Sequence, residues 1–293
     1  MAKLQVGVIG VSGGIGKMRA SHFSQNPKSQ VVAVCCRSEA TLKQRAAEVG
    51  ARGYTDWRQV VDDPDVQAVS IATPNVFHYD MARYALERGR HVSVEYPLVQ
   101  SPAQLDELAG LAKRKGVVLH DALTVRVEGH HVALRENLGR LGRLVCARIR
   151  YFGGKKWYVD EKLAGNMFVA LHIHFVDQFI DLFGEVAWLD ATKRILADKE
   201  IHFGTILMGF KSGVVGYIEF GMNFPGSPSY SSTIVGDGGY IEFNRLPRSP
   251  MPTIIGQDAK GPFEVPIPEV SAIKVDSDNF VAEVVDGAAP ISP

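Results

Sequence analysis

The sequence predicts an α/β protein of two domains: a doubly wound parallel sheet, followed by an α+β domain with an open, largely antiparallel sheet. Three observations predict this fold class. Residues 4–120 alternate short apolar runs with helical segments, later runs alternate apolar with polar residues, and 46% of the 293 residues are hydrophobic, enough for buried cores. We therefore expect one domain over residues 1–122 and a second over residues 123–293.

The first half of the chain reads as strands that alternate with helices. Apolar runs bounded by glycine or polar residues predict buried strands, and helical compositions follow them. The predicted strands are 4–9, 30–36, 66–73, 91–94 and 117–120, and the predicted helices are 17–24, 39–49, 78–87 and 102–115. Ser101 is a favourable N-cap beside Pro102 at the first helical position. The pattern indicates a parallel sheet covered on both faces.

The second half changes in character from about Val127. Its predicted strands are 145–152, 187–194, 201–210, 214–220, 232–235 and 240–244, with helices over 131–138 and 166–182. Alternating strands with one polar face favour an antiparallel sheet that carries helices on the other face. The segment 245–268, rich in proline and glycine, is expected to form surface loop and edge structure.

Composition excludes several classes of partner. The 32 Lys and Arg balance the 32 Asp and Glu, so no overall field draws the protein to nucleic acid or anionic lipid. Cys35, Cys36 and Cys146 have neither disulfide nor metal-ligand spacing. The N-terminus turns glycine-rich before a signal peptide or membrane span is complete. We expect a cytoplasmic protein with no metal, no membrane and no nucleic-acid partner.

A glycine-rich turn follows the first predicted strand. Its residues are Gly10, Val11, Ser12, Gly13, Gly14, Ile15 and Gly16. Glycine lets a backbone turn tightly at a strand end and approach a pyrophosphate, which then receives N–H groups from the next helix. The motif alone can be a simple turn, but its place in a βαβ unit favours a dinucleotide site.

The end of the second strand bears on the choice of cofactor. NAD sites usually place an acidic residue there, whereas this chain has Arg37 and Ser38, which suit a 2′-phosphate. We therefore predict NADP(H), with NAD(H) as the alternative if Arg37 is only a solvated loop residue.

Two further segments, 72–78 (ATPNVFH) and 89–98 (GRHVSVEYPL), resemble the glucose-fructose oxidoreductase and inositol dehydrogenase family. So do residues 165–184, the turn at 236–239 and residues 278–281, so the resemblance spans nearly the whole chain. It implies a Rossmann domain followed by a substrate-binding and oligomerisation domain. Under this resemblance the cofactor is lined by Thr73, Pro74, Asn75, His78, Glu95 and Tyr96.

The resemblance also carries expectations about assembly and the end of the chain. The open sheet of the second domain is commonly a subunit interface, which implies a homodimer or homotetramer. Family members continue past the segment matching 278–285 with a helix that returns to the first domain. This sequence stops at Pro293, so we expect part of the first domain's surface to be exposed or covered by a partner chain.

Two positions depart from the family pattern. Typical members carry Glu-Lys-Pro where this chain has Glu95-Tyr96-Pro97, a form that resembles biliverdin reductases. Sugar-oxidising members place an aspartate four residues before the histidine that matches His174, where this chain has Ala170. A tyrosine supplies a neutral hydrogen-bonding group in place of a fixed positive charge, and the missing aspartate puts a polyol substrate in doubt.

His174 is the first candidate for proton exchange with a substrate, and Tyr96 is the second. Their alternatives are a histidine packed in a helix interface and an aromatic packed under the cofactor ring. The further substrate-binding candidates are Arg126, Lys156, Trp157 and Asn166. We expect an NADP(H)-dependent oxidoreductase acting on a C=O or C=N centre of a small molecule; a bilin reductase and a non-catalytic NADP(H) sensor are the alternatives.

Overall fold

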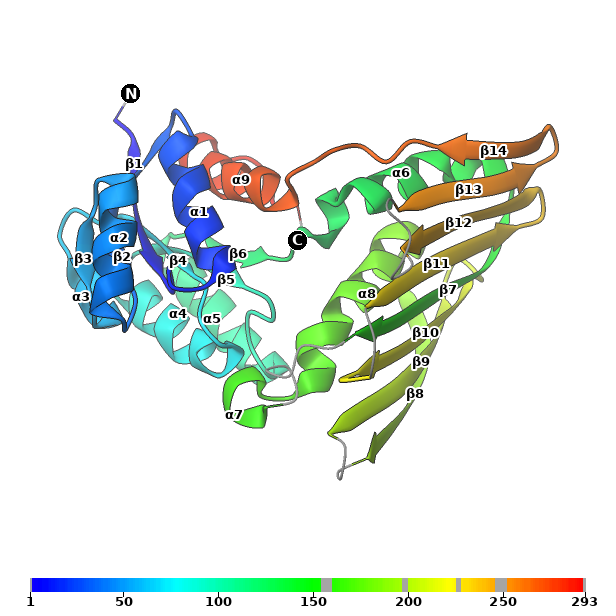
Figure 1. The fold of residues 1–293 in the computed structure, drawn as a ribbon, viewed down its shortest axis with the longest axis horizontal. Helices are drawn as coiled ribbons and strands as arrows, with labels where there is room; N and C mark the ends of the chain where they lie inside the picture. Colours follow the sequence, from blue (N-terminus) through cyan, green and yellow to red (C-terminus); the bar gives the residue numbers. More distant parts are fainter. Residues whose placement is uncertain (1, 154–159, 197–199, 225–227, 246–251, 292–293) are drawn as a thin grey trace. The chain divides into compact units, whose positions relative to one another are not determined.

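The computed structural model describes residues 2–153, 160–196, 200–224, 228–245 and 252–291 (Figure 1). The chain divides into two compact units. The first consists of Met1–Thr124, Lys162–Ala170 and Ser271–Pro293, and the second of Val125–Glu161 and Leu171–Val270. The predicted domains, residues 1–122 and 123–293, differ from these units in the two later segments, which cluster with the first unit.

The first unit contains a six-stranded sheet in the order β3-β2-β1-β4-β5-β6, and every neighbouring pair is parallel. This is the Rossmann strand order. The strands are β1 (Leu4–Ile9), β2 (Ser29–Cys35), β3 (Arg52–Tyr54), β4 (Ala68–Ile71), β5 (His91–Glu95) and β6 (Leu119–Ala122). The helices are α1 (Gly14–Gln25), α2 (Glu39–Val49), α3 (Trp57–Asp62), η1 (Asn75–Phe77), α4 (His78–Glu87), α5 (Pro102–Lys115) and α9 (Ala272–Asp286).

Two apolar cores fill the faces of this sheet. One holds side chains from α3, α4 and α5, such as Val60, Leu86 and Leu108. The other holds side chains from α1, α2 and α9, such as Phe23 and Phe280, whose ring centroids lie 6.1 Å apart. Because the strands are buried on both faces, they read in the sequence as nearly continuous apolar runs.

Helix α9 is the last described helix of the chain and belongs to the first unit. It packs against α1 and contributes Phe280 and Val281, both almost fully buried, to a core of the first unit. Helix α9 therefore covers one face of the first sheet together with α1 and α2.

The second unit contains an eight-stranded sheet in the order β14-β13-β12-β11-β7-β10-β9-β8. Only the β7–β10 pair is parallel among the pairs of this sheet that the structure describes. Its strands are β7 (Leu144–Gly153), β8 (Val186–Leu196), β9 (Ile201–Phe210), β10 (Val215–Met222), β11 (Ser229–Gly236), β12 (Gly239–Arg245), β13 (Thr253–Asp258) and β14 (Gly261–Val265). Strands β13 and β14 form an edge of the sheet within the segment expected to hold loop and edge structure.

Helices lie on one face of the second sheet (Figure 1). Its helical segments are η2 (Thr124–Val127), α6 (Gly129–Asn137), η3 (Leu138–Leu141), and α8 (Met167–Phe183), which begins in the first unit; the short α7 (Glu161–Ala164) precedes α8. Phe179 of α8 packs where the glycine at 216 leaves room, since a Cβ at Gly216 would lie 2.7 Å from its ring. No helix of the described residues is long and apolar enough to cross a membrane.

Candidate functional site

The carboxyl ends of four parallel strands bring the predicted cofactor residues to one edge of the first sheet. Ile9 pairs with Cys35 on one side and with Ile71 on the other, and Ile71 pairs with Val94. The glycine turn, Arg37 and the Thr73 loop therefore follow strands that end at the same level, and Glu95 is the last residue of β5 at that level. In open α/β sheets, ligands bind outside this edge.

Two glycines of the turn are required by the packing of the chain itself. Gly10 has a φ of +98°, and a Cβ there would lie 2.2 Å from the carbonyl oxygen of Ala72. A Cβ at Gly16 would lie 2.3 Å from the carbonyl oxygen of Gly10. Larger residues at these two positions would clash with backbone, so these glycines say nothing about a ligand.

Packing of the chain does not require glycine at the other two positions, Gly13 and Gly14. A Cβ at Gly14 would meet nothing within 4 Å, and one at Gly13 only the Gly10 oxygen at 3.9 Å. Both residues are exposed at the start of α1, where the first N–H groups of a helix have no intrahelical acceptor. A side chain would fill this space, so the cradle fits a diphosphate that approaches the backbone closely.

Arg37 and Ser38 follow β2 beside this turn. Arg37 is exposed. Ser38 is the N-cap of α2, and its Oγ accepts a hydrogen bond of 3.4 Å from the Thr41 N–H. The hydroxyl thus orients the start of α2, while the guanidinium remains accessible to an anion.

His78 holds two loops of this edge together. Its Nδ1 lies 2.9 Å from the Pro97 oxygen and its Nε2 lies 2.8 Å from the Thr73 oxygen. The ring is fully buried, and burial lowers its pKa although both carbonyl contacts favour the charged form. His78 has no exposed surface, and its ring holds the Thr73 loop in place.

The side chains of Asn75 and Glu95, two further cofactor-binding candidates, also bind partners within the first unit. Asn75 is buried, and its Nδ2 donates to the Ala164 oxygen at 3.4 Å. The Glu95 Oε1 accepts from the Arg19 Nε at 2.7 Å, so its carboxylate faces inward. Burial raises the pKa of Glu95, and the nearby Arg19 opposes that rise. Tyr96 is half-buried, and the Tyr96–Pro97 peptide is cis.

The second unit places His174 on α8, where it is half-buried. Desolvation lowers the pKa of His174 to about 4, so its imidazole is neutral at pH 7. Its neighbour His172 is buried, with its ring centroid 3.3 Å from that of Phe220.

The remaining candidates for substrate binding differ in the contacts that the structure gives them. Arg126 donates to both carboxylate oxygens of Asp177, from Nε at 2.8 Å and Nη2 at 2.6 Å. Its guanidinium is therefore already engaged, which weighs against a direct substrate contact. The backbone N–H of Asn166 donates to the Gln100 Oε1 at 3.0 Å. Lys156 and Trp157 lie outside the described residues.

Comparison with known proteins identifies the family. Residues 4–122 match the model of the oxidoreductase family with an NAD-binding Rossmann fold, and residues 133–242 match the GFO/IDH/MocA C-terminal domain. The chain belongs to this oxidoreductase family. The expected Rossmann unit, the open-sheet unit and the resemblance are thereby confirmed, and the chain is an NAD(P)-binding oxidoreductase.

Relatives within the GFO/IDH/MocA family act on different substrates. The chain is 27% identical to levoglucosan dehydrogenase of Pseudarthrobacter phenanthrenivorans, over 88% of this chain and 78% of that protein. It is 25% identical to myo-inositol 2-dehydrogenase of Thermotoga maritima, over 74% of this chain and 68% of that protein. A solved biliverdin reductase of Synechocystis, in complex with biliverdin and NADP⁺, superposes with a TM-score of 0.87 at 27% identity, over 98% of this chain and 92% of that one.

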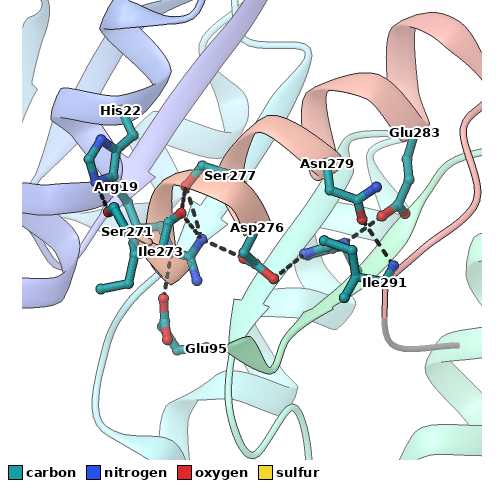
Figure 2. Close-up of polar contacts among 11 residues, drawn as sticks. Arg19, His22, Glu95, Ser271, Ile273, Asp276, Ser277, Asn279, Glu283 and Ile291 are labelled. Atoms are coloured by element: carbon teal, nitrogen blue, oxygen red, sulfur yellow. Dashed lines mark hydrogen bonds and ion pairs between the residues drawn. The ribbon is translucent and has the colours of Figure 1, made fainter. Parts of the chain in front are cut away.

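The sequence did not predict the buried residues that support Glu95 in this GFO/IDH/MocA protein. Arg19 and Asp276 are buried and joined by a hydrogen bond (Figure 2). His120 is also buried and hydrogen-bonds to Asp276. A weak signal existed for Arg19, which stands one helical turn after the last glycine on a helix that must pack against the sheet. His120 and Asp276 are 156 residues apart, and no local pattern connects them.

Proposed function

We propose that the protein is an NADPH-dependent oxidoreductase that reduces a C=O or C=N centre of a small molecule. The observation that carries this proposal is the cradle at Gly13 and Gly14, where the backbone leaves room that packing does not require. The accessible Arg37 beside it supports NADPH, because a guanidinium can pair with a 2′-phosphate. NADH is the alternative cofactor.

Tyr96 and His174 are the proposed catalytic residues. A bound nicotinamide supplies the hydride, and the protein must exchange one proton with the substrate heteroatom. A tyrosine phenol can donate that proton. His174, with a pKa lowered to about 4, holds a neutral imidazole that can hydrogen-bond to the substrate and orient its heteroatom toward the proton that Tyr96 donates.

A bilin is the substrate class that we favour within this proposal. Under the resemblance described above, Tyr96 stands where typical members carry lysine, and Ala170 stands where sugar-oxidising members carry aspartate. Both changes remove charged groups that would hold a polyol. The similarity to a biliverdin reductase solved with biliverdin and NADP⁺ supports the same direction.

The test is consumption of NADPH with a panel of biliverdin, cyclic imines and keto-sugars, followed as the loss of absorbance of the reduced nicotinamide. We expect turnover with biliverdin, and turnover that is lost in His174→Ala and Tyr96→Phe while NADPH still binds. Turnover with a keto-sugar alone would overturn the bilin assignment. Tight NADPH binding without turnover of any compound would favour a redox sensor.

A second copy of the chain is the proposed partner of the open face of the second sheet. Val215 and Trp188 both lie opposite Gly209 in the ladder, so they share a face with Leu207, two residues before it. These three side chains are 36–46% exposed, whereas Met208 on the other face is fully buried. Apolar side chains spread over an exposed sheet are typical of a subunit interface.

A further inference from the structure

A chain of buried polar side chains joins helix α9 to the Glu95–Tyr96 segment inside the first unit (Figure 2). Its centre is Arg19 of α1, whose side chain is completely buried. The Arg19 Nε donates to Glu95 at 2.7 Å, and its Nη1 donates to the Asp276 Oδ2 at 2.5 Å. The same Nη1 donates to the Ser277 Oγ at 2.9 Å and to the Ile273 oxygen at 3.2 Å. Glu95 is thus held by an arginine that α9 holds in turn.

His120 of β6 fixes the other end of this chain. Its Nε2 lies 3.3 Å from the Asp276 Oδ1, and its Nδ1 lies 2.8 Å from the Glu283 Oε1. Both ring nitrogens face carboxylates, so the doubly protonated ring satisfies both contacts. Asp276 therefore accepts from Arg19 with one oxygen and from His120 with the other, which leaves its carboxylate a single orientation.

The location of Glu95 gives this chain a functional meaning. Glu95 is the peptide neighbour of Tyr96, and Pro97 on the other side is held through its carbonyl by His78. The backbone of Tyr96 is therefore anchored on both sides by buried contacts. A phenol that must meet reacting atoms needs such support, because a displacement of about 1 Å can lower a rate by about 100-fold.

We propose that Asp276 of α9 is a positioning residue that fixes Tyr96 for the proposed reaction. It acts through Arg19, which it orients, and Arg19 acts through Glu95. Ser277 assists by holding the same Arg19 nitrogen, and His120 assists by holding Asp276. This inference rests on the proposed function for the role of Tyr96, but not for the anchoring itself.

The experiment compares Asp276→Asn and Ser277→Ala with Asp278→Asn as the matched control. Asp278 lies on the same helix and accepts from Asn26 at 2.6 Å and from Lys274 at 2.5 Å, but it does not contact Arg19. Asparagine keeps the size of Asp276 and removes the charge that holds the guanidinium. Ser277→Ala removes one hydrogen bond to Arg19 and suits a helix, so it keeps the test valid if Asp276→Asn does not fold.

The first readout is independent of turnover. The protein carries nine tyrosines, so ¹⁵N-tyrosine labelling gives a simple amide spectrum in which Tyr96→Phe identifies the Tyr96 signal. Recorded with NADP⁺ added, this signal should shift and broaden in Asp276→Asn, and less in Ser277→Ala, while Asp278→Asn leaves it unchanged. A Tyr96 signal that is unchanged in the folded Asp276→Asn or Ser277→Ala protein would overturn the proposal.

The second readout uses whichever compound of the panel is turned over. Asp276→Asn should lower kcat by about 10- to 100-fold, with the Kd for NADPH changed by less than about two-fold, because only the orientation of the phenol is lost. An unchanged kcat together with a displaced Tyr96 signal would also overturn the role in the reaction. If no compound is turned over, the proposed function fails, whereas the Tyr96 signal still decides whether α9 anchors this segment.

Discussion

At single residues, the glycines of the turn after β1 differ in why glycine is present. Gly10 and Gly16 are fixed by backbone contacts within the chain, whereas Gly13 and Gly14 face open space. A glycine motif read from sequence cannot make this distinction, because it depends on what lies next to each Cα in the folded state. The distinction separates the effects of substitution on stability from those on binding.

This difference predicts opposite outcomes for two alanine substitutions. Gly16→Ala should lower the free energy of unfolding by about 1–3 kcal/mol, because its Cβ would overlap the Gly10 carbonyl. Gly13→Ala should change stability by less than about 1 kcal/mol and weaken NADPH binding roughly ten-fold or more, because the methyl group occupies the cradle. Urea denaturation and NADPH fluorescence titration check the pair. Equal NADPH affinity in Gly13→Ala and wild type would remove the cradle from the account.

Arg37 decides the cofactor prediction at the same scale. In Arg37→Asp, the Kd for NADPH should rise roughly ten-fold or more, since a hydrogen bond to a charged group contributes about 1.5–3 kcal/mol. The Kd for NADH should stay the same or fall, because an acidic side chain suits a free ribose 2′-hydroxyl. Paired titrations with the two nucleotides measure the ratio. A parallel change in both affinities would show that Arg37 does not contact a 2′-phosphate.

At the scale of elements, the sequence predicted those whose signals are local. The helices over 39–49, 78–87 and 102–115 have the predicted bounds, and Ser101 caps the last of them. Strand β3 and helix α3 were missed, because three and six residues are too short to show a period. The contacts of Glu95 and His78 could not be predicted either, because Arg19 lies 76 residues from Glu95 and Pro97 lies 19 residues from His78.

The buried chain of charges makes stability depend on pH through His120. Burial lowers its pKa, but the hydrogen bonds to Asp276 and Glu283 outweigh burial and raise the pKa from 6.5 to about 9. A raised folded-state pKa stabilises the fold fully below the unfolded value, and this contribution is lost as pH rises through about 9. Its size is at most about 3 kcal/mol.

The corresponding variant is His120→Gln. Between pH 6 and 9.5, the free energy of unfolding should fall for the wild type by more than it does for the variant, so the difference between the two proteins shrinks as pH rises. Urea denaturation at several pH values gives both curves. Parallel curves would mean that the His120 imidazolium is not held by the two carboxylates.

In the whole molecule, helix α9 is far along the chain but packs in the first unit, against α1. Helix α9 supplies Phe280 to a core that starts with β1, and it supplies Asp276 to Arg19 of α1. The order of elements along the chain does not predict this packing, because an amphipathic helix can cover any sheet face of suitable shape. The first unit is complete only when the last described helix has packed.

The proposed interface on the open face of the second sheet can be tested through the oligomeric state. If a second copy covers the open face of the second sheet, Leu207→Glu should convert the oligomer to monomer, because a buried unpaired carboxylate is unfavourable in an interface. Leu105→Glu is the control, since Leu105 is also exposed but lies on α5 of the first unit. Light scattering coupled to size exclusion gives the mass. A wild-type protein that already has the monomer mass would contradict the proposed partner.

The proposed oxidoreductase activity requires that the turn after β1 hold the diphosphate of a nicotinamide nucleotide. A crystal structure of the protein with NADPH tests it most directly. We expect density for the diphosphate against the backbone of Gly13 and Gly14, with the 2′-phosphate beside Arg37. A turn that stays empty at saturating NADPH, or a nucleotide bound elsewhere, would contradict it.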